Sequence, residues 1–197
     1  MVLLALAALG ASPRTLRAQM PHLVPSLHWG FGKAVNDYQS ECEGISMAAS
    51  LDIKGRGRVF PQFALDHFVG NGMGGVECAM TTPTTGGLRL DRATRLGLGI
   101  GGRLRKGPVQ GEAVLRAGII TGHQGYTEAA VSDDRQVLPH VGGQVALVFF
   151  RWIVLSHSTH WTRLTFDTWS DGRVASSQST WKPMYTWQFG VRWPTQP

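Results

Sequence analysis

The sequence predicts an all-β protein, an eight-stranded antiparallel up-and-down transmembrane β-barrel with four long loops and three short turns. Three observations lead to this fold. The stretch from Tyr185 to Trp193 alternates apolar or aromatic side chains with polar or small ones, as a strand with two different faces does. Similar stretches recur along the chain. The segments between them are long and short in turn, which is typical of barrels that cross a membrane.

The first residues have the pattern of an export signal. Val2 to Ala11 is an apolar run of the length of a signal-peptide core, too short to cross a membrane as a helix. Leu16-Arg17-Ala18, followed by Gln19, fits a cleavage site. We therefore expect residues 1–18 to be a signal peptide and residues 19–197 to form one outer-membrane barrel domain. No basic residue precedes the apolar run, which leaves open a start codon further upstream.

The composition favours strands over helices. The chain has 25 glycines and many Thr, Val, Trp and Phe residues, which are enriched in β-structure or its turns. Its formal net charge is +6, but the basic residues do not form one stripe interleaved with aromatics, so nucleic acid is not an expected partner. No later apolar run approaches the roughly 20 residues of a membrane helix. A membrane-embedded form would therefore use strands.

The first three strands follow from alternation. In the first, residues 22–35, one face carries Leu23, Pro25, Leu27, Trp29 and Phe31. The second, residues 45–53, is the most regular, with one face made of Ile45, Met47, Ala49, Leu51 and Ile53. The third, residues 59–69, has an outward face of Val59, Pro61, Phe63, Leu65 and Val69, with Phe60 and Phe68 as exceptions. A polar loop, 36–43, and a basic turn, 54–58, separate them.

The remaining strands are read in the same way. A Gly/Thr-rich loop, 70–87, leads to the fourth strand, about 88–104, and a short basic turn, 105–108, leads to the fifth, which begins at Val109. After a loop at 122–139, the sixth strand runs from Val141 and reverses near Arg151 into the seventh, 152–166. A last long loop, 167–182, precedes the closing strand, 184–193.

The two faces decide between a membrane barrel and a soluble one. The broad apolar face of the closing strand predicts lipid contacts for Tyr185, Trp187, Phe189, Val191 and Trp193. The polar face predicts lumen charges, namely Asp52, Asp66, Arg95, Glu112, Arg116 and Arg192. A soluble lipocalin-like barrel would have these faces inverted. Eight strands enclose a space that side chains fill, so we expect paired charges and no open pore, with a proton or ion path as the alternative.

The resulting architecture resembles the small eight-stranded outer-membrane barrels of the OmpA/OmpX type. The closing strand is also similar to the C-terminal signal read by the barrel-assembly machinery, through Gln188, Gly190 and Trp193, and departs from it where Pro194-Thr195-Gln196-Pro197 follows. The resemblance implies a bacterial outer-membrane location. It also implies outer-membrane lipid and lipopolysaccharide as surroundings, and the assembly machinery as a partner during insertion.

Two cysteines, Cys42 and Cys78, fall in the first and second long loops. In an exported protein, two cysteines on the same side of a barrel favour a disulfide, which would stabilise the fold by about 2–4 kcal/mol. Two unpaired thiols are the alternative. Metal binding lacks partners at a suitable spacing, and the histidines show none either, so we expect no metal and no cofactor.

Charge is sorted between the two ends of the predicted barrel. The long loops carry acids, namely Asp37, Glu41, Glu43, Glu77, Glu128, Asp133, Asp134, Asp167 and Asp171, against Arg135, Arg173 and Lys182. The short turns carry bases without any acid, namely Lys54, Arg56, Arg58, Arg103, Arg105, Lys106 and Arg151. This pattern predicts an acidic mouth for cations or a basic partner, or simply solvated loops. Loops that face anionic lipopolysaccharide are more often basic, which counts against this orientation.

The seventh strand breaks the pattern, because neither phase of residues 153–163 is cleanly apolar. A local break of this kind is expected at a functional site or at a β-bulge with polar residues turned inward. If Ser158 and His160 faced lipid, they would be adjacent as a nucleophile and its base. This faintly resembles outer-membrane lipid A deacylases, which carry a His and a Ser two apart. Here His157-Ser158-Thr159 is the other possible match.

We therefore expect a non-enzymatic outer-membrane barrel with a structural or surface-binding role, whose ligand the sequence does not name. Two alternatives remain open, a lipid A-modifying hydrolase on the same barrel and a soluble exported lipocalin-like binder.

Overall fold

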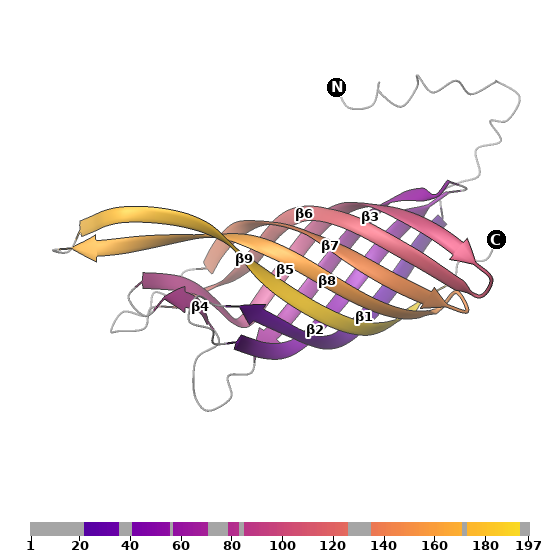
Figure 1. Ribbon diagram of the computed structural model, residues 1–197, viewed down its shortest axis with the longest axis horizontal. Helices are drawn as coiled ribbons and strands as arrows, with labels where there is room; N and C mark the ends of the chain where they lie inside the picture. Colours follow the sequence, from indigo (N-terminus) through magenta and orange to yellow (C-terminus); the bar gives the residue numbers. More distant parts are fainter. Residues whose placement is uncertain are drawn as a thin grey trace, which may run out of the picture.

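The computed structural model describes residues 22–35, 41–55, 57–70, 79–82, 85–125, 135–170 and 173–193. Within these ranges the chain is built of strands joined by short turns (Figure 1). The strands are β1 (His22–Val35), β2 (Glu41–Lys54), β3 (Val59–Gly70), β4 (Ala79–Thr82), β5 (Thr85–Lys106), β6 (Val109–Gly125), β7 (Arg135–Phe149), β8 (Ile153–Ser170) and β9 (Arg173–Arg192). The described segments include no helix with the length and apolar character needed to traverse a bilayer.

Eight of these strands close into a barrel. Each pairs in antiparallel fashion with its neighbours, β1 pairs with β9, and β3 pairs with β5. The short strand β4 lies outside this ring and forms a hairpin with the first residues of β5. The predicted all-β, up-and-down, eight-stranded antiparallel barrel is therefore confirmed.

The long connections are shorter than expected, because the strands continue into them. The segment 167–182 was expected to be a loop, but β8 and β9 stay paired as far as Ser170 and Arg173. These two strands project beyond the barrel wall at the left of Figure 1. Strands β2, β4, β5, β6 and β7 likewise occupy parts of the other predicted loops. Beyond the barrel both faces of a ribbon meet water, so its sequence lacks the alternation that reveals a strand.

The outer and inner faces have the polarity of a membrane barrel. Leu98 and Leu115 point outward and are 69% and 71% exposed, whereas Asp52 points inward and is 0% exposed. Strand β3 alternates in the same way over its whole length. Phe60 and Phe68, the exceptions in the sequence pattern, are inward and buried near the two ends of the lumen.

The expected break in the seventh strand, now β8, does not occur. Ser156, Ser158 and His160 are buried and inward, while Leu155 and Trp161 are exposed on the outside. Pairing with β7 and β9 is continuous across residues 153–162 without a bulge. Both faces of β8 carry polar residues, so its own sequence does not determine which face points into the lumen. The pairing with β7 and β9 determines it.

Inward glycines make room for inward ring side chains of other strands. The ring of His160 lies over Gly142, where an added Cβ would come within 2.5 Å of Nδ1. The ring of His140 lies in the same way over Gly97. Pairing a small residue with a large one fills the lumen of a narrow barrel.

Candidate functional site in the barrel lumen

Two apolar layers enclose a polar lumen. At the end away from the short turns, the buried side chains are Ala34, Phe68, Ala93, Ile120 and Met184. At the short-turn end they are Val24, Phe60, Val148 and Val154. Most of the buried polar and charged residues lie between these layers, but Lys54 and Arg192 are level with the short-turn layer and line a pocket there together with Val24 and Val148.

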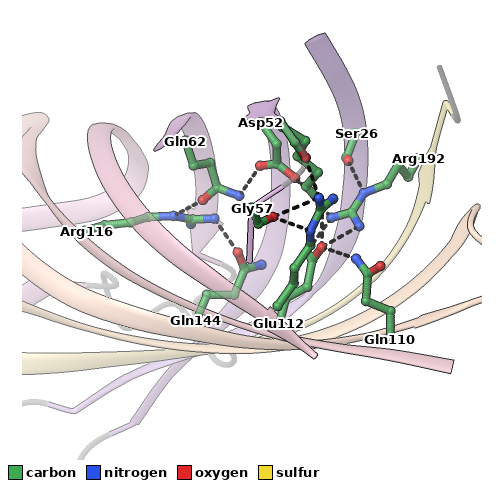
Figure 2. A network of polar contacts seen from close by, with 12 residues as sticks. Ser26, Asp52, Gly57, Gln62, Gln110, Glu112, Arg116, Gln144 and Arg192 are labelled. Carbon is green, nitrogen blue, oxygen red and sulfur yellow. Dashed lines mark hydrogen bonds and ion pairs between the residues drawn. The ribbon is translucent and has the colours of Figure 1, made fainter. Parts of the chain in front are cut away.

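A charged cluster lies towards the short-turn end (Figure 2). The Arg192 guanidinium donates to both oxygens of Glu112, at 2.9 and 2.6 Å, and to Asp52 Oδ2 at 3.2 Å. Lys54 forms ion pairs with Glu112 and, at 3.0 Å, with Asp52. Arg192 Nε also donates to Ser26 Oγ at 3.2 Å. Two carboxylates are thus balanced by two cations, the arrangement that buried charges need.

One glutamine, Gln62, connects this cluster to Arg116 (Figure 2). Gln62 donates to Asp52 Oδ1 at 2.6 Å and accepts from Arg116 Nε at 2.7 Å. Arg116 also donates to Gln144, and its Nη1 lies 3.8 Å from Asp66 Oδ2. A buried amide can donate and accept at once, so it extends a polar network without adding charge.

Arg95 is different from the other lumen charges. It is 2% exposed, and neither Nη1 nor Nη2 has a hydrogen-bond partner among the described residues. Asp66 lies opposite it on β3, and its Oδ1 is also unpartnered. The expectation of mutually paired lumen charges therefore does not extend to this guanidinium. An unpaired buried charge is costly, so Arg95 marks the least satisfied part of the lumen.

Ser158 and His160 do not form a lipid-facing pair. Both are buried in the lumen, the Ser158 hydroxyl is hydrogen-bonded to Thr186, and neither ring nitrogen of His160 has a partner in the described part of the chain. His160 instead packs edge to face on His140, with ring centroids 5.3 Å apart. The outward members of this segment are His157 and Thr159, with Nε2 and Oγ1 3.4 Å apart.

His157 and Thr159 border an apolar groove of about 930 Å³ on the outer wall over β5 to β8. Its other walls include Ile100, Leu115, Val141, Val145 and Trp161. The His157 ring also packs on Trp187, with centroids 4.3 Å apart. Within the described residues no carboxylate contacts this histidine, so the third group that orients a catalytic base is not present there.

The remaining predicted residues are placed as follows. Trp187, Phe189 and Trp193 are exposed on the outer wall, with Tyr185 and Val191 half-buried on the same face. The six predicted lumen charges, Asp52, Asp66, Arg95, Glu112, Arg116 and Arg192, are buried inside the barrel.

Lys54 was expected in a basic turn, but it is inside the lumen and bound to Glu112. Its position two residues after Asp52 was the signal that sequence reasoning overlooked, because residues two apart in a strand share a face.

Some predictions fall outside the described ranges. Cys42 is in β2 and not in a loop, but Cys78 lies outside the described residues, so the disulfide stays a prediction. Residues 1–21 and most of the loop acids are also outside these ranges, although Glu41, Glu43 and Asp167 belong to strands. Within the described residues, no group of three or more His, Cys, Asp or Glu is placed to hold a metal ion.

No protein-family model matches the chain, and no curated protein matches it in sequence. Several solved structures match its fold. Neisserial surface protein A has a TM-score of 0.57 at 11% identity, with 86% of this chain and 95% of that one covered. The attachment invasion locus protein Ail of Yersinia pestis has a TM-score of 0.49 at 9% identity, with 88% and 99% covered. The outer membrane protein OprG of Pseudomonas aeruginosa has a TM-score of 0.46 at 8% identity, with 89% and 98% covered. The fold is that of the small outer-membrane barrels.

Proposed function

We propose that the protein is a non-enzymatic bacterial outer-membrane barrel that anchors a projecting β8–β9 hairpin for binding at the cell surface. The observation that carries the membrane part is the inverted polarity of the wall, with large apolar side chains outside and charges inside. Exposed apolar area of this extent would not be stable in water. In the proposed orientation the short turns face the periplasm and the hairpin faces outward.

The packing of the lumen supports an anchor and not a pore. Phe68, Ile120 and Met184 are buried at one end of the lumen, and Phe60 and Val154 at the other. Between them the charges are bonded to one another across the lumen. Eight strands leave room only for such side chains. We therefore propose that neither solutes nor ions pass through the barrel.

The surface-binding part rests on the outer edges of the hairpin, along which no strand of the described residues continues the pairing. Pairing of β8 with β7 ends at Thr162, and pairing of β9 with β1 ends at Met184. From there to Ser170 and Arg173 the two strands pair with each other. Free strand edges are templates to which an extended polypeptide can add. We propose that an extended segment of a partner protein is the ligand.

The membrane part is tested with a matched pair of substitutions. Leu98 and Leu104 are both outward on β5, and Leu104 lies close to the short turn. In lipid vesicles Leu98→Arg should lower the free energy of unfolding by about 2–4 kcal/mol, and Leu104→Arg by about 0–1 kcal/mol. If both substitutions lowered the free energy of unfolding by the same small amount, a membrane location would be contradicted. Conductance steps in planar bilayers containing the wild type would contradict the absence of a pore.

The binding part is tested by shortening the hairpin. Residues 166–178 are replaced by Asn-Gly, so that Thr165 and Ser179, which are paired in the structure, flank a two-residue turn. The shortened protein should fold normally in vesicles but lose binding to an unfolded probe chain, reduced and carboxymethylated α-lactalbumin. Undiminished binding would contradict the assignment of the hairpin as the binding element.

A lipid A-modifying hydrolase remains the second candidate, and one observation favours it. His157 and Thr159 face outward in contact distance beside an apolar groove, as a lipid-cleaving pair would. Thr159→Ala and Ser158→Ala are compared in cells by mass spectrometry of lipid A. A change in acylation with the first and not the second would support the hydrolase, whereas an unchanged lipid A with both would exclude it.

A further inference from the structure

The short-turn end of the barrel carries a group of cations that no carboxylate of the described residues neutralises. We call it the basic rim, formed by Arg58, Arg103, Arg105, Lys106 and Arg151. No acid lies in the described turns at this end, residues 55, 57–58, 103–108 and 150–152. Asp52 and Glu112, the acids beneath it, are already bonded to Lys54 and Arg192. The rim therefore presents a net positive charge on its own.

Backbone contacts hold the rim in a fixed arrangement. Arg103 donates through its side chain to Gly55 O at 2.6 Å and Gly57 O at 2.9 Å, which ties β5 to the β2–β3 turn. The Phe150 amide donates to Pro108 O at 3.0 Å, which ties the β7–β8 turn to the β5–β6 turn. Carbonyl acceptors orient a guanidinium without cancelling its charge. Arg103 is thus held in position, and its charge is still available to an anion.

The β7–β8 turn is backbone-strained. Phe150 and Arg151 have φ values of 53° and 73°, a left-handed conformation that usually belongs to Gly or Asn in such two-residue turns. Strain of this kind is expected where a side chain at the position serves a function. Here it places Arg151 beside a pocket of about 120 Å³ at the short-turn mouth of the lumen, which Arg103 and Arg105 line together with Lys54 and Arg192 of the lumen cluster.

Apolar side chains surround the basic rim at the same level. Leu104 is 68% and Phe150 65% exposed, and Trp152 is also exposed. Aromatic side chains in such positions mark the boundary between hydrocarbon and headgroups. A lipid beside this turn would have its chains on Phe150 and Trp152 and its phosphate level with Arg105 and Arg151. Clustered basic residues at this depth attract anionic lipid.

We infer that the basic rim binds the phosphate of an anionic phospholipid in the adjoining membrane leaflet, with Arg105 and Arg151 as its main ligands. The inference rests on the proposed membrane location. Guanidinium groups suit a phosphate oxygen pair, and the pocket has room for one such group. The lumen network does not compete, because its carboxylates and cations are paired with one another.

Native mass spectrometry of the detergent-solubilised protein tests the inference, with phosphatidylglycerol and phosphatidylethanolamine of identical chains as probes. The wild type should retain the anionic lipid preferentially. Arg105→Gln with Arg151→Gln should weaken that binding by about 25-fold, from about fivefold per basic residue. Arg163→Gln, which removes an exposed charge at the other end of the barrel, should leave it unchanged. Arg151→Gly should stabilise the strained turn and still weaken lipid binding.

Four results would overturn the inference. These are equal retention of the two lipids, an equal loss with Arg163→Gln, undiminished binding by the Arg105/Arg151 double variant, and displacement of the lipid by millimolar inorganic phosphate, which would assign the rim to free phosphate. Insertion into vesicles is measured in parallel. A protein that does not insert contradicts both the membrane proposal and this inference, whereas one that inserts without a lipid preference contradicts only the inference.

Discussion

Replacing Arg192 by Met should destabilise the barrel more than any exposed charge would. The guanidinium donates to both oxygens of Glu112 and to Asp52, and all three residues are buried. After the substitution, Lys54 alone faces two carboxylates, so one negative charge is left uncompensated in the lumen. Breaking a buried pair in this way costs about 3–5 kcal/mol. Solvent screening does not reduce this figure, because the cluster is shielded from water.

The reasoning is tested by a double-mutant cycle in lipid vesicles. Urea unfolding is followed by tryptophan fluorescence, and unboiled gel mobility checks that each variant is folded. Glu112→Gln combined with Arg192→Met leaves Asp52 paired with Lys54. The double variant should therefore be at least about 1.5 kcal/mol more stable than the sum of the single effects predicts. Arg163→Met is the matched control and should change stability by less than about 0.5 kcal/mol.

A loss below about 1 kcal/mol for Arg192→Met, or strict additivity in the cycle, would refute the reasoning. Either result would mean that water reaches the cluster and screens it, in which case the apolar layer of Phe60, Val148 and Val154 does not seal the lumen.

Two further predictions concern the part of the lumen away from the short turns. Arg95→Met should raise the free energy of unfolding by about 1–3 kcal/mol in urea titrations, because it removes a buried guanidinium whose two terminal nitrogens have no hydrogen-bond partner among the described residues; a loss of stability would show that the attraction between Arg95 and Asp66, which lies opposite it, outweighs that cost. Gly142→Ala should lower stability by about 1–3 kcal/mol, since the new Cβ would lie 2.4 Å from Thr159 O. Gly102→Ala, where nothing lies within 4 Å, should change it by less than about 0.5 kcal/mol, and equal effects would contradict the packing argument.

The membrane-embedded strands could be predicted from the sequence because lipid and lumen impose opposite demands on alternate residues. Ile45, Met47 and Ile53 are outward in β2 as their alternation requires. The hairpin between residues 167 and 182 could not be recognised in this way. Both of its faces are outside the barrel wall, so no face has to be apolar, and its pairing is visible only in the register of β8 with β9.

The candidate site in the lumen could likewise be predicted only in part from the sequence. The alternation of each strand predicted that Asp52, Glu112 and Arg192 point inward. It did not predict which of these side chains form ion pairs with one another. Glu112 and Arg192 are 80 positions apart, and Asp52 and Arg192 are 140 apart. Their contacts depend on strand tilt and barrel closure, which sequence alternation does not contain. The lack of hydrogen-bond partners for Arg95 among the described residues could not be predicted from the sequence either. Its nearest acid by register, Asp66, lies directly opposite on the adjacent strand β3.

The lumen cluster also bears on how the barrel closes. Arg192, on the last strand, donates to Ser26 on the first and reaches Glu112 on β6 and Asp52 on β2. Only the pairing of β9 with β1 is a backbone contact between neighbours; the other two bonds cross the lumen. An open sheet cannot make these cross-lumen bonds, because residues on non-adjacent strands of its inner face lie far apart. They therefore stabilise the closed form selectively, and in the open sheet the same charges would remain hydrated. The projecting part of β8 and β9, near residues 170 and 173, lies at the opposite end of these strands from Arg192, so its length and sequence can change without loss of the closed barrel.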